Sequence, residues 1–148
     1  MQQYYVHFFI DAYNAFHFIM SNQFIIQERG KRFMKEQGKG VSTSTIILGT
    51  WAIGGNHWGP SDDAGAIRAI ETAINNGIHT IDTAPVYGDG HAEELVGKAI
   101  QGKREKVFLA SKCGLDIYTN KYQRNLSSPY IEHDLTQSLR RLKTEYID

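Results

Sequence analysis

The sequence predicts an α/β fold with a parallel sheet, because short apolar runs alternate with helical patterns from about residue 45 to residue 148. The apolar runs start near residues 45, 78, 107 and 146, so the repeating units are 33, 29 and 39 residues long. Units of about 30 residues or more are typical of a strand, a crossover helix and the next strand. Glycine and asparagine residues separate the units, as they do at helix ends and turns.

The first unit pairs a strand at Thr45–Thr50 with a helix that begins after residue 61. We interpret the run TIILGT as a buried strand that ends in a glycine. Ser61-Asp62-Asp63 is a good helix cap, because such side chains accept hydrogen bonds from the first free amides of a helix. A helical stripe follows and is ended by Asn75-Asn76-Gly77. The stripe consists of Ile67, Ile70 and Ile74.

The second unit consists of a strand at Ile78–Thr83 and a helix at about Ala92–Gln101. One side of this helix is apolar, which predicts that it packs against the sheet. The residues on that side are Leu95, Val96, Ala99 and Ile100.

The third unit begins with a strand at Val107–Ser111, and its helix opens with Ser128 as the cap and Pro129 as the first helical residue. Tyr146–Asp148 is the start of a fourth strand. The apolar face expected on the third helix consists of Ile131, Leu135, Leu139 and Leu142.

Alternation alone does not separate an open, doubly wound sheet from a segment of a barrel. A dinucleotide-binding sheet carries G-x-G-x-x-G directly after its first strand. The segment Gly49–Gly55 does not fit that pattern, and Glu93 takes the place of the third glycine after Gly88 and Gly90. We therefore predict a partial (β/α)8 barrel with three β/α units and the start of strand four. A complete barrel needs about 250 residues, and this chain has 148.

In such barrels the active site lies at the C-terminal ends of the strands. Three strand ends are available, and two adjacent ones bring an acid, a phenol and an amine to one mouth: Asp82, Tyr87 and Lys112. Carbonyl reduction needs a hydride and a proton. A tyrosine hydroxyl can donate the proton, and a neighbouring ammonium makes this easier because it favours the phenolate. Tyr87 would be the general acid, Lys112 the group that tunes it, and Asp82 the anchor of the lysine.

These motifs resemble the aldo-keto reductase family, in family order and spacing. The matching segments are LGTWAIGG (48–55), GIHTIDTAPVYGDGHAEELVGKAI (77–100), VFLASKCG (107–114) and SLRRLKTEYID (138–148). The resemblance implies an NADPH-dependent enzyme that reduces aldehydes or ketones to alcohols. It implies catalytic roles for Asp82, Tyr87 and Lys112. It also implies that Gly49, Thr50 and Trp51, together with Asp82, contact the cofactor.

The family's catalytic histidine lies on strand four, a few residues beyond Asp148, and strands five to eight follow it. We therefore expect a truncated chain whose own activity is doubtful. Two alternatives remain open. The chain could be a non-catalytic NADPH-binding or regulatory protein, as potassium-channel β-subunits of this fold are. It could also be a non-functional gene remnant.

Residues 1–40 differ from the rest and are read as an atypical, aromatic-rich extension and linker, with the barrel portion at 41–148. Tyr5, Phe9, Phe16 and Met20 follow helix-like spacings. The stretch Glu28–Gly40 reads as the linker. We expect the extension to act in packing or self-association, because three strands and a fragment leave open sheet edges that pair with other chains.

The amino-acid composition excludes some classes of function and indicates the cellular setting. Sixteen basic and sixteen acidic residues give no net charge, which argues against nucleic-acid or membrane-surface binding. The single cysteine, Cys113, indicates a reducing, cytoplasmic setting. We see neither a signal peptide nor a membrane span, and no metal-ligand spacing. The expected partner is a small-molecule carbonyl substrate.

Overall fold

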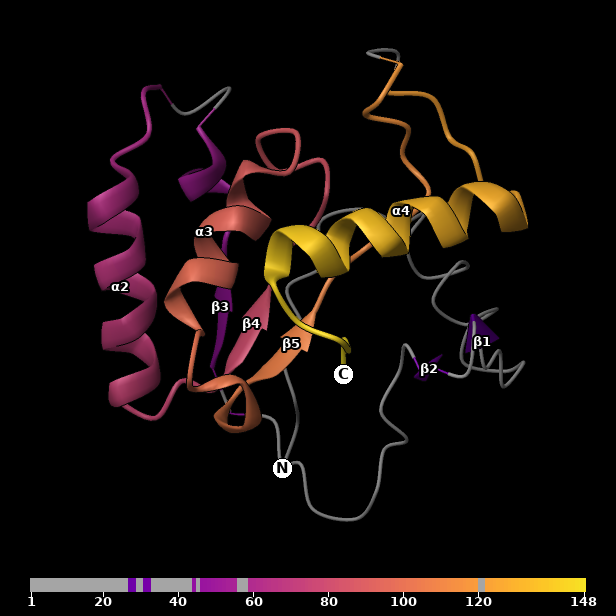
Figure 1. Ribbon diagram of the computed structural model, residues 1–148. Helices are drawn as coiled ribbons and strands as arrows, with labels where there is room; N and C mark the ends of the chain where they lie inside the picture. The colour runs from indigo at the N-terminus through magenta and orange to yellow at the C-terminus, as the bar shows by residue number, and fades with distance from the viewer. Residues whose placement is uncertain (1–26, 29–30, 33–43, 45, 56–58, 120–121) are drawn as a thin grey trace, which may run out of the picture.

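A computed structural model shows three parallel strands in the order β3-β4-β5 (Figure 1). They are β3 (Ile47–Gly49), β4 (Thr80–Asp82) and β5 (Phe108–Ala110). Each strand lies inside the range predicted from the sequence and is shorter than that range. The structure describes residues 27–28, 31–32, 44, 46–55, 59–119 and 122–148.

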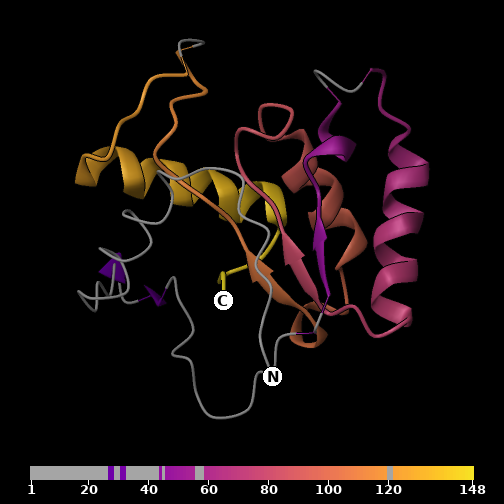
Figure 2. The same ribbon diagram turned by 180° about the vertical axis from the view of Figure 1, so that it is seen from behind.

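Three helices follow the strands in alternation, as predicted: α2 (Asp63–Asn75), α3 (His91–Ala99) and α4 (Ser128–Leu142). Short 3-10 helices, η1 (Ala52–Gly54) and η3 (Arg104–Lys106), lie in the connections. All three α-helices lie on one side of the sheet, and the view from behind shows the bare strands in front of them (Figure 2). This arrangement is a segment of a (β/α)8 barrel, in which helices cover only the outer face.

Successive side chains along a strand point to opposite faces of the sheet, so their positions in the sequence determine which face each one occupies. Leu48, Ile81 and Leu109 are aligned across the three strands and pack against the helices. Their partners in the core are Ile70, Ile74, Val96, Ala99, Ile100, Val107 and Leu142. The next row along the strands, Gly49, Asp82 and Ala110, therefore lies on the opposite face.

The prediction of a buried first strand was wrong. Ile46 is 64% exposed and Ile47 is 48% exposed. Ile46 precedes β3, whereas Ile47 lies on the second face of the sheet, which no helix of the described chain covers. Only the helix-facing side of β3 is packed, through Leu48.

The ends of α2 confirm the predicted helix signals. The Asp62 carboxylate accepts a hydrogen bond from the Gly65 amide at 2.9 Å, which caps the first turn. Asn76 caps the other end, and Gly77 follows with a φ of 86°. A side chain is strained at that φ, so glycine suits the turn that leads into β4.

The third helix differs from the prediction in its start and in its buried face. Ser127, with extended backbone, is the cap, so Ser128 is already helical. Two polar residues on the inner face, Asp134 and Ser138, are buried beside Leu139 and Leu142. Ile131 and Leu135, which were expected in the core, are only half-buried. The inner face of α4 is therefore partly polar.

The chain after α4 returns to the edge of the sheet beside β5, where the sequence predicts strand four. The Asp148 amide donates to the Leu109 carbonyl at 3.0 Å, and the Leu109 amide donates to Asp148 Oδ2 at 3.0 Å. Ile147 packs against the core. The sheet therefore continues past β5 in the expected direction.

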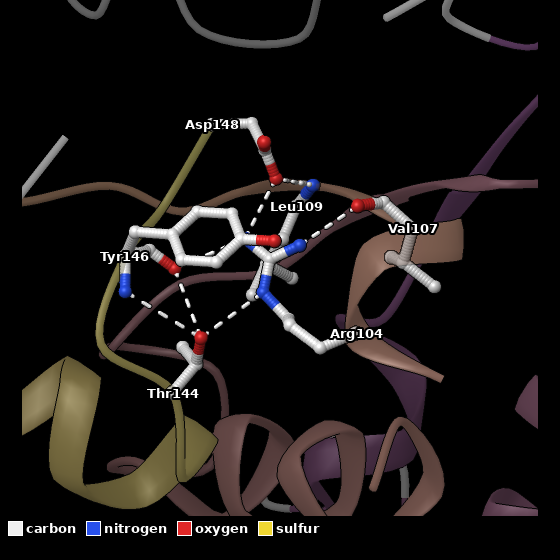
Figure 3. A network of polar contacts seen from close by, with 6 residues as sticks. All are labelled: Arg104, Val107, Leu109, Thr144, Tyr146 and Asp148. Atoms are coloured by element: carbon white, nitrogen blue, oxygen red, sulfur yellow. Dashed lines mark hydrogen bonds and ion pairs between the residues drawn. The ribbon is translucent and has the colours of Figure 1, made fainter. Parts of the chain in front are cut away.

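Arg104 holds this returning segment (Figure 3). Its guanidinium donates to Asp148 Oδ2 at 2.7 Å, to the Tyr146 carbonyl at 3.0 Å and to the Thr144 hydroxyl at 3.0 Å. It also donates to the Val107 carbonyl and lies 3.8 Å from the centre of the Tyr146 ring. One side chain thus ties the start of β5 to residues 144–148.

The predicted linker contains two short strands, β1 (Gln27–Glu28) and β2 (Lys31–Arg32), which pair in antiparallel fashion. The helix predicted from Tyr5 to Met20 lies outside the described residues. Within the part of the chain that the structure describes, no helix is long and apolar enough to cross a membrane.

We predict that Arg104→Leu lowers the free energy of unfolding by about 3 kcal/mol, because it leaves the carboxylate of Asp148 buried without its cation. The two side chains are only 13% and 7% exposed. The matched control is Lys103→Leu, which removes an exposed pair with Glu71 and should cost less than about 1 kcal/mol. Urea unfolding of both variants measures the difference. Equal losses would show that the Arg104 contacts do not stabilise the fold.

Candidate active site

The predicted catalytic residues meet at the C-terminal edge of the sheet. Asp82 is the last residue of β4, and Lys112 follows β5 by two positions. The Lys112 ammonium donates to both oxygens of the Asp82 carboxylate, at 2.7 and 2.8 Å, and to the Thr83 carbonyl at 3.1 Å. The side chains are 41% and 37% exposed, so water screens the pair. Its geometry matters more than its contribution to stability, which is at most about 1 kcal/mol.

Tyr87 joins this pair from the turn after β4. The Lys112 ammonium lies 4.9 Å from the centre of the Tyr87 ring, a cation–π distance. Trp51 stacks on Tyr87, with the two ring centres 6.2 Å apart and the ring planes at an angle of 28°. An acid, an amine and a phenol from two strand ends therefore form one cluster, with an indole beside it.

Two glycines allow the turn that carries Tyr87 to approach η1. A Cβ atom at Gly54 would lie 2.8 Å from the carbonyl of Tyr87, and one at Gly88 would lie 2.1 Å from the carbonyl of Gly54. No side chain fits at such separations. Gly88 also has a φ of 65°, which glycine adopts most readily. The close contact between the two backbones fixes the position of Tyr87.

The first-strand residues divide into two kinds. Thr50 is fully buried, and both its amide and its hydroxyl donate to the Asp82 carbonyl at 3.0 Å. It therefore holds the end of β3 against the end of β4. Gly49 and Trp51 are open to solvent, with Trp51 47% exposed. Gly49, Thr50, Trp51 and Asp82 stay the predicted cofactor contacts, with Thr50 placed behind the exposed ones.

The loop between β5 and α4 reaches the turn that carries Tyr87. The Tyr122 hydroxyl donates to both Asp89 carboxylate oxygens, at 2.9 and 3.0 Å. Asp89 and Tyr122 both have left-handed backbone, with φ of 52° and 46°. Such conformations are uncommon for residues other than glycine. The contact brings the loop to the border of the site.

One further side chain near the site, Cys113, has a defined protonation state. Burial raises the pKa of the Cys113 thiol, and the nearby Asp134 carboxylate adds to this effect, so the thiol stays protonated at neutral pH. Among the described residues, no group of three His, Cys, Asp or Glu side chains is arranged to hold a metal ion. Asp82, Tyr87 and Lys112 form a cluster that offers proton donation and charge stabilisation.

Comparison with known families agrees with this geometry. Residues 45–148 match the model of the aldo/keto reductase family. The chain is 49% identical over 111 residues to the aldo-keto reductase YhdN of Bacillus subtilis (strain 168), an alignment that covers 74% of this chain and 34% of the relative. It is 37% identical over 121 residues to the NADH-specific methylglyoxal reductase of Escherichia coli (strain K12), covering 73% and 37%.

Solved structures give the same result. An aldo-keto reductase from Bacillus halodurans (holo form) matches with a TM-score of 0.65 and 32% identity, covering 80% of this chain and 38% of that one. An aldo-keto reductase from Klebsiella pneumoniae in complex with NADPH matches with a TM-score of 0.56 and 35% identity, covering 69% and 32%. The protein belongs to the aldo/keto reductase family, and the chain spans about a third of the length of these relatives.

We predict that Gly54→Ala lowers the free energy of unfolding by about 1–3 kcal/mol, because the added methyl group forces backbone atoms apart. Gly49→Ala is the matched control, since a Cβ there meets nothing within 4 Å and should change stability by less than about 0.5 kcal/mol. Urea unfolding compares the two. A neutral Gly54→Ala would mean that the turn carrying Tyr87 does not pack against η1.

Proposed function

We propose that this chain provides the proton-donating side of an NADPH-dependent reductase that converts aldehydes or ketones to alcohols. The observation that carries the proposal is the Lys112 ammonium, which Asp82 holds by two hydrogen bonds beside the Tyr87 ring. Here its charge lies where a reacting carbonyl oxygen beside Tyr87 would need it.

In this mechanism the carbonyl oxygen of the substrate faces the Tyr87 hydroxyl. When bound, NADPH supplies the hydride that reduces the carbonyl carbon. The Tyr87 O–H bond breaks as the proton moves to the carbonyl oxygen, which completes the alcohol. The Lys112 ammonium stabilises the negative charge that remains on the phenolate oxygen. Asp82 keeps the ammonium in place, and a proton from water restores Tyr87.

The residues at the strand ends fit the nicotinamide part of such a cofactor. A Cβ at Gly49 would meet no atom within 4 Å, so the surface beside Asp82 is open. Trp51 offers a half-exposed aromatic face next to it. A flat ring can pack on that surface within reach of Tyr87. The Klebsiella pneumoniae relative in complex with NADPH supports NADPH as the cofactor, and the NADH-specific Escherichia coli relative makes NADH the necessary comparison.

The proposal includes a small-molecule carbonyl substrate and a reducing, cytoplasmic setting. The single cysteine of the chain, Cys113, supports that setting, because it has no second cysteine with which to form an internal disulfide. It also includes self-association of the chain. The exposed side chain of Ile47 on the helix-free face of the sheet supports this part, because exposed apolar strands invite pairing.

We predict that NADPH quenches the fluorescence of Trp51 in a saturable manner, because the nicotinamide would pack beside this ring. The measurement uses a Trp58→Phe background, so that Trp51 is the single tryptophan. NADH, titrated in parallel, should bind more weakly. Gly49→Val, which places a side chain on the open surface, should abolish the quenching without unfolding the chain.

A folded chain with no quenching by either nucleotide would contradict the proposed cofactor site. Equal quenching of the Gly49→Val variant would place the nucleotide elsewhere on the surface.

A further inference from the structure

Two carboxylates that take no part in the proposed chemistry are completely buried. Glu93 on α3 and Asp134 on α4 both have 0% exposure. Burial of an ionised carboxylate costs several kcal/mol unless the group is paired and hydrogen-bonded. Replacing a buried ion pair with well-packed apolar residues of similar volume often leaves stability unchanged or raises it. Stability alone therefore does not account for these two carboxylates, and their hydrogen-bond partners indicate their role.

Glu93 binds the residue that directly precedes Lys112. Its Oε1 atom accepts a hydrogen bond from the Ser111 hydroxyl at 2.7 Å. Its Oε2 atom accepts one from Arg141 Nε at 2.7 Å, and the Arg141 side chain is itself only 14% exposed. Both oxygens are thus used, one on the strand end and one on a cation from α4.

Asp134 binds the other end of the same short segment. Its Oδ2 atom accepts a hydrogen bond from the Gly114 amide at 3.2 Å, and its Oδ1 atom accepts one from the Tyr118 hydroxyl at 3.0 Å. Burial raises the pKa of the Asp134 carboxyl, while these hydrogen bonds act against that shift. The segment 111–114 is therefore held at its first and last residues by buried carboxylates.

Arg141 connects the two halves of this arrangement. Its guanidinium reaches the Tyr118 hydroxyl at 3.4 Å, and Tyr118 in turn binds Asp134. Two glycines of the α3 region make room for the arginine. A Cβ atom at Gly90 would lie 2.6 Å from Arg141 Cδ, and one at Gly97 would lie 2.5 Å from the Arg141 carbonyl. The packing of α4 on α3 thus seats the cation between the carboxylates.

Lys112 leaves the segment 111–114 and reaches Asp82 and Thr83 at the end of β4. Its ammonium lies at the end of a flexible stem, so its position depends on the backbone from which it departs. With residues 111 and 114 both fixed, that backbone has little freedom. A residue that fixes this backbone influences the reaction through the position of Lys112, without touching the reacting atoms.

We propose that Glu93 and Asp134 are positioning residues, which clamp the segment 111–114 so that Lys112 is held at Asp82 and Tyr87. The catalytic meaning of this clamp rests on the proposed function. The clamp itself is a property of the chain and is testable without cofactor or turnover.

The test measures how fast the protons of the Lys112 ammonium exchange with water, by ¹⁵N NMR of the lysine Nζ resonances of the full chain. Lys112→Arg assigns the signal, because its resonance disappears. Ser111→Ala removes the contact of Glu93 next to Lys112 but keeps the pair of Glu93 and Arg141. Ser138→Ala is the matched control, since Ser138 is buried and its hydroxyl accepts a hydrogen bond from Arg141 rather than contacting Glu93.

We expect exchange at Lys112 to become about fivefold faster in Ser111→Ala, the factor for one lost hydrogen bond. Ser138→Ala should leave the rate unchanged, and Ser111→Thr, which keeps the hydroxyl, should restore it. Circular dichroism and urea unfolding verify that each variant is folded.

Equal exchange rates in Ser111→Ala and Ser138→Ala would overturn the proposal. This readout also distinguishes the clamp from the proposed function. A chain that shows the Ser111→Ala effect but binds no NADPH would contradict the proposed function and leave the clamp intact.

Discussion

The structure depends on the alternation of side chains along three short parallel strands. Leu48, Ile81 and Leu109 form one row and give the sheet an apolar face on which all three helices pack. Because the next residue of each strand points the other way, the same register places Asp82 on the helix-free face. Burial of the core and exposure of the acid are therefore consequences of one pattern. A slip by one residue would reverse both.

The same helices support the site from behind. The polar inner face of α4 and the start of α3 carry Glu93, Arg141 and Asp134, which reach the strand end that bears Lys112. Close glycine contacts between η1 and the turn after β4 fix Tyr87. Arg104 then secures the return of the chain to the edge of β5. Rigid packing on one face of the sheet thus fixes flexible side chains on the other.

The order of strands and helices could be predicted from the sequence, because the spacing of apolar residues and caps such as Asp62 and Asn76 indicate where these elements lie. The cluster of Asp82, Tyr87 and Lys112 was predictable because parallel strands end at one edge. The exposure of Ile47 could not be predicted, because an apolar residue type does not reveal whether other elements cover the face of the sheet on which it lies. The polar core around Glu93 was also missed. Its signal was present in Asp134, Ser138 and Arg141, which recur at helical spacing on one face of α4.

If the residues of this chain bring Asp82 and Lys112 together, the two side chains must stabilise each other. A double-mutant cycle of Asp82→Asn and Lys112→Met, followed by urea unfolding, measures this coupling. We expect a favourable coupling free energy of about 0.5 kcal/mol for this half-exposed pair. The same cycle with Lys106→Met, at an exposed lysine with no contact to Asp82 in the structure, should give none. Indistinguishable coupling in the two cycles would show that Asp82 and Lys112 do not pair in solution.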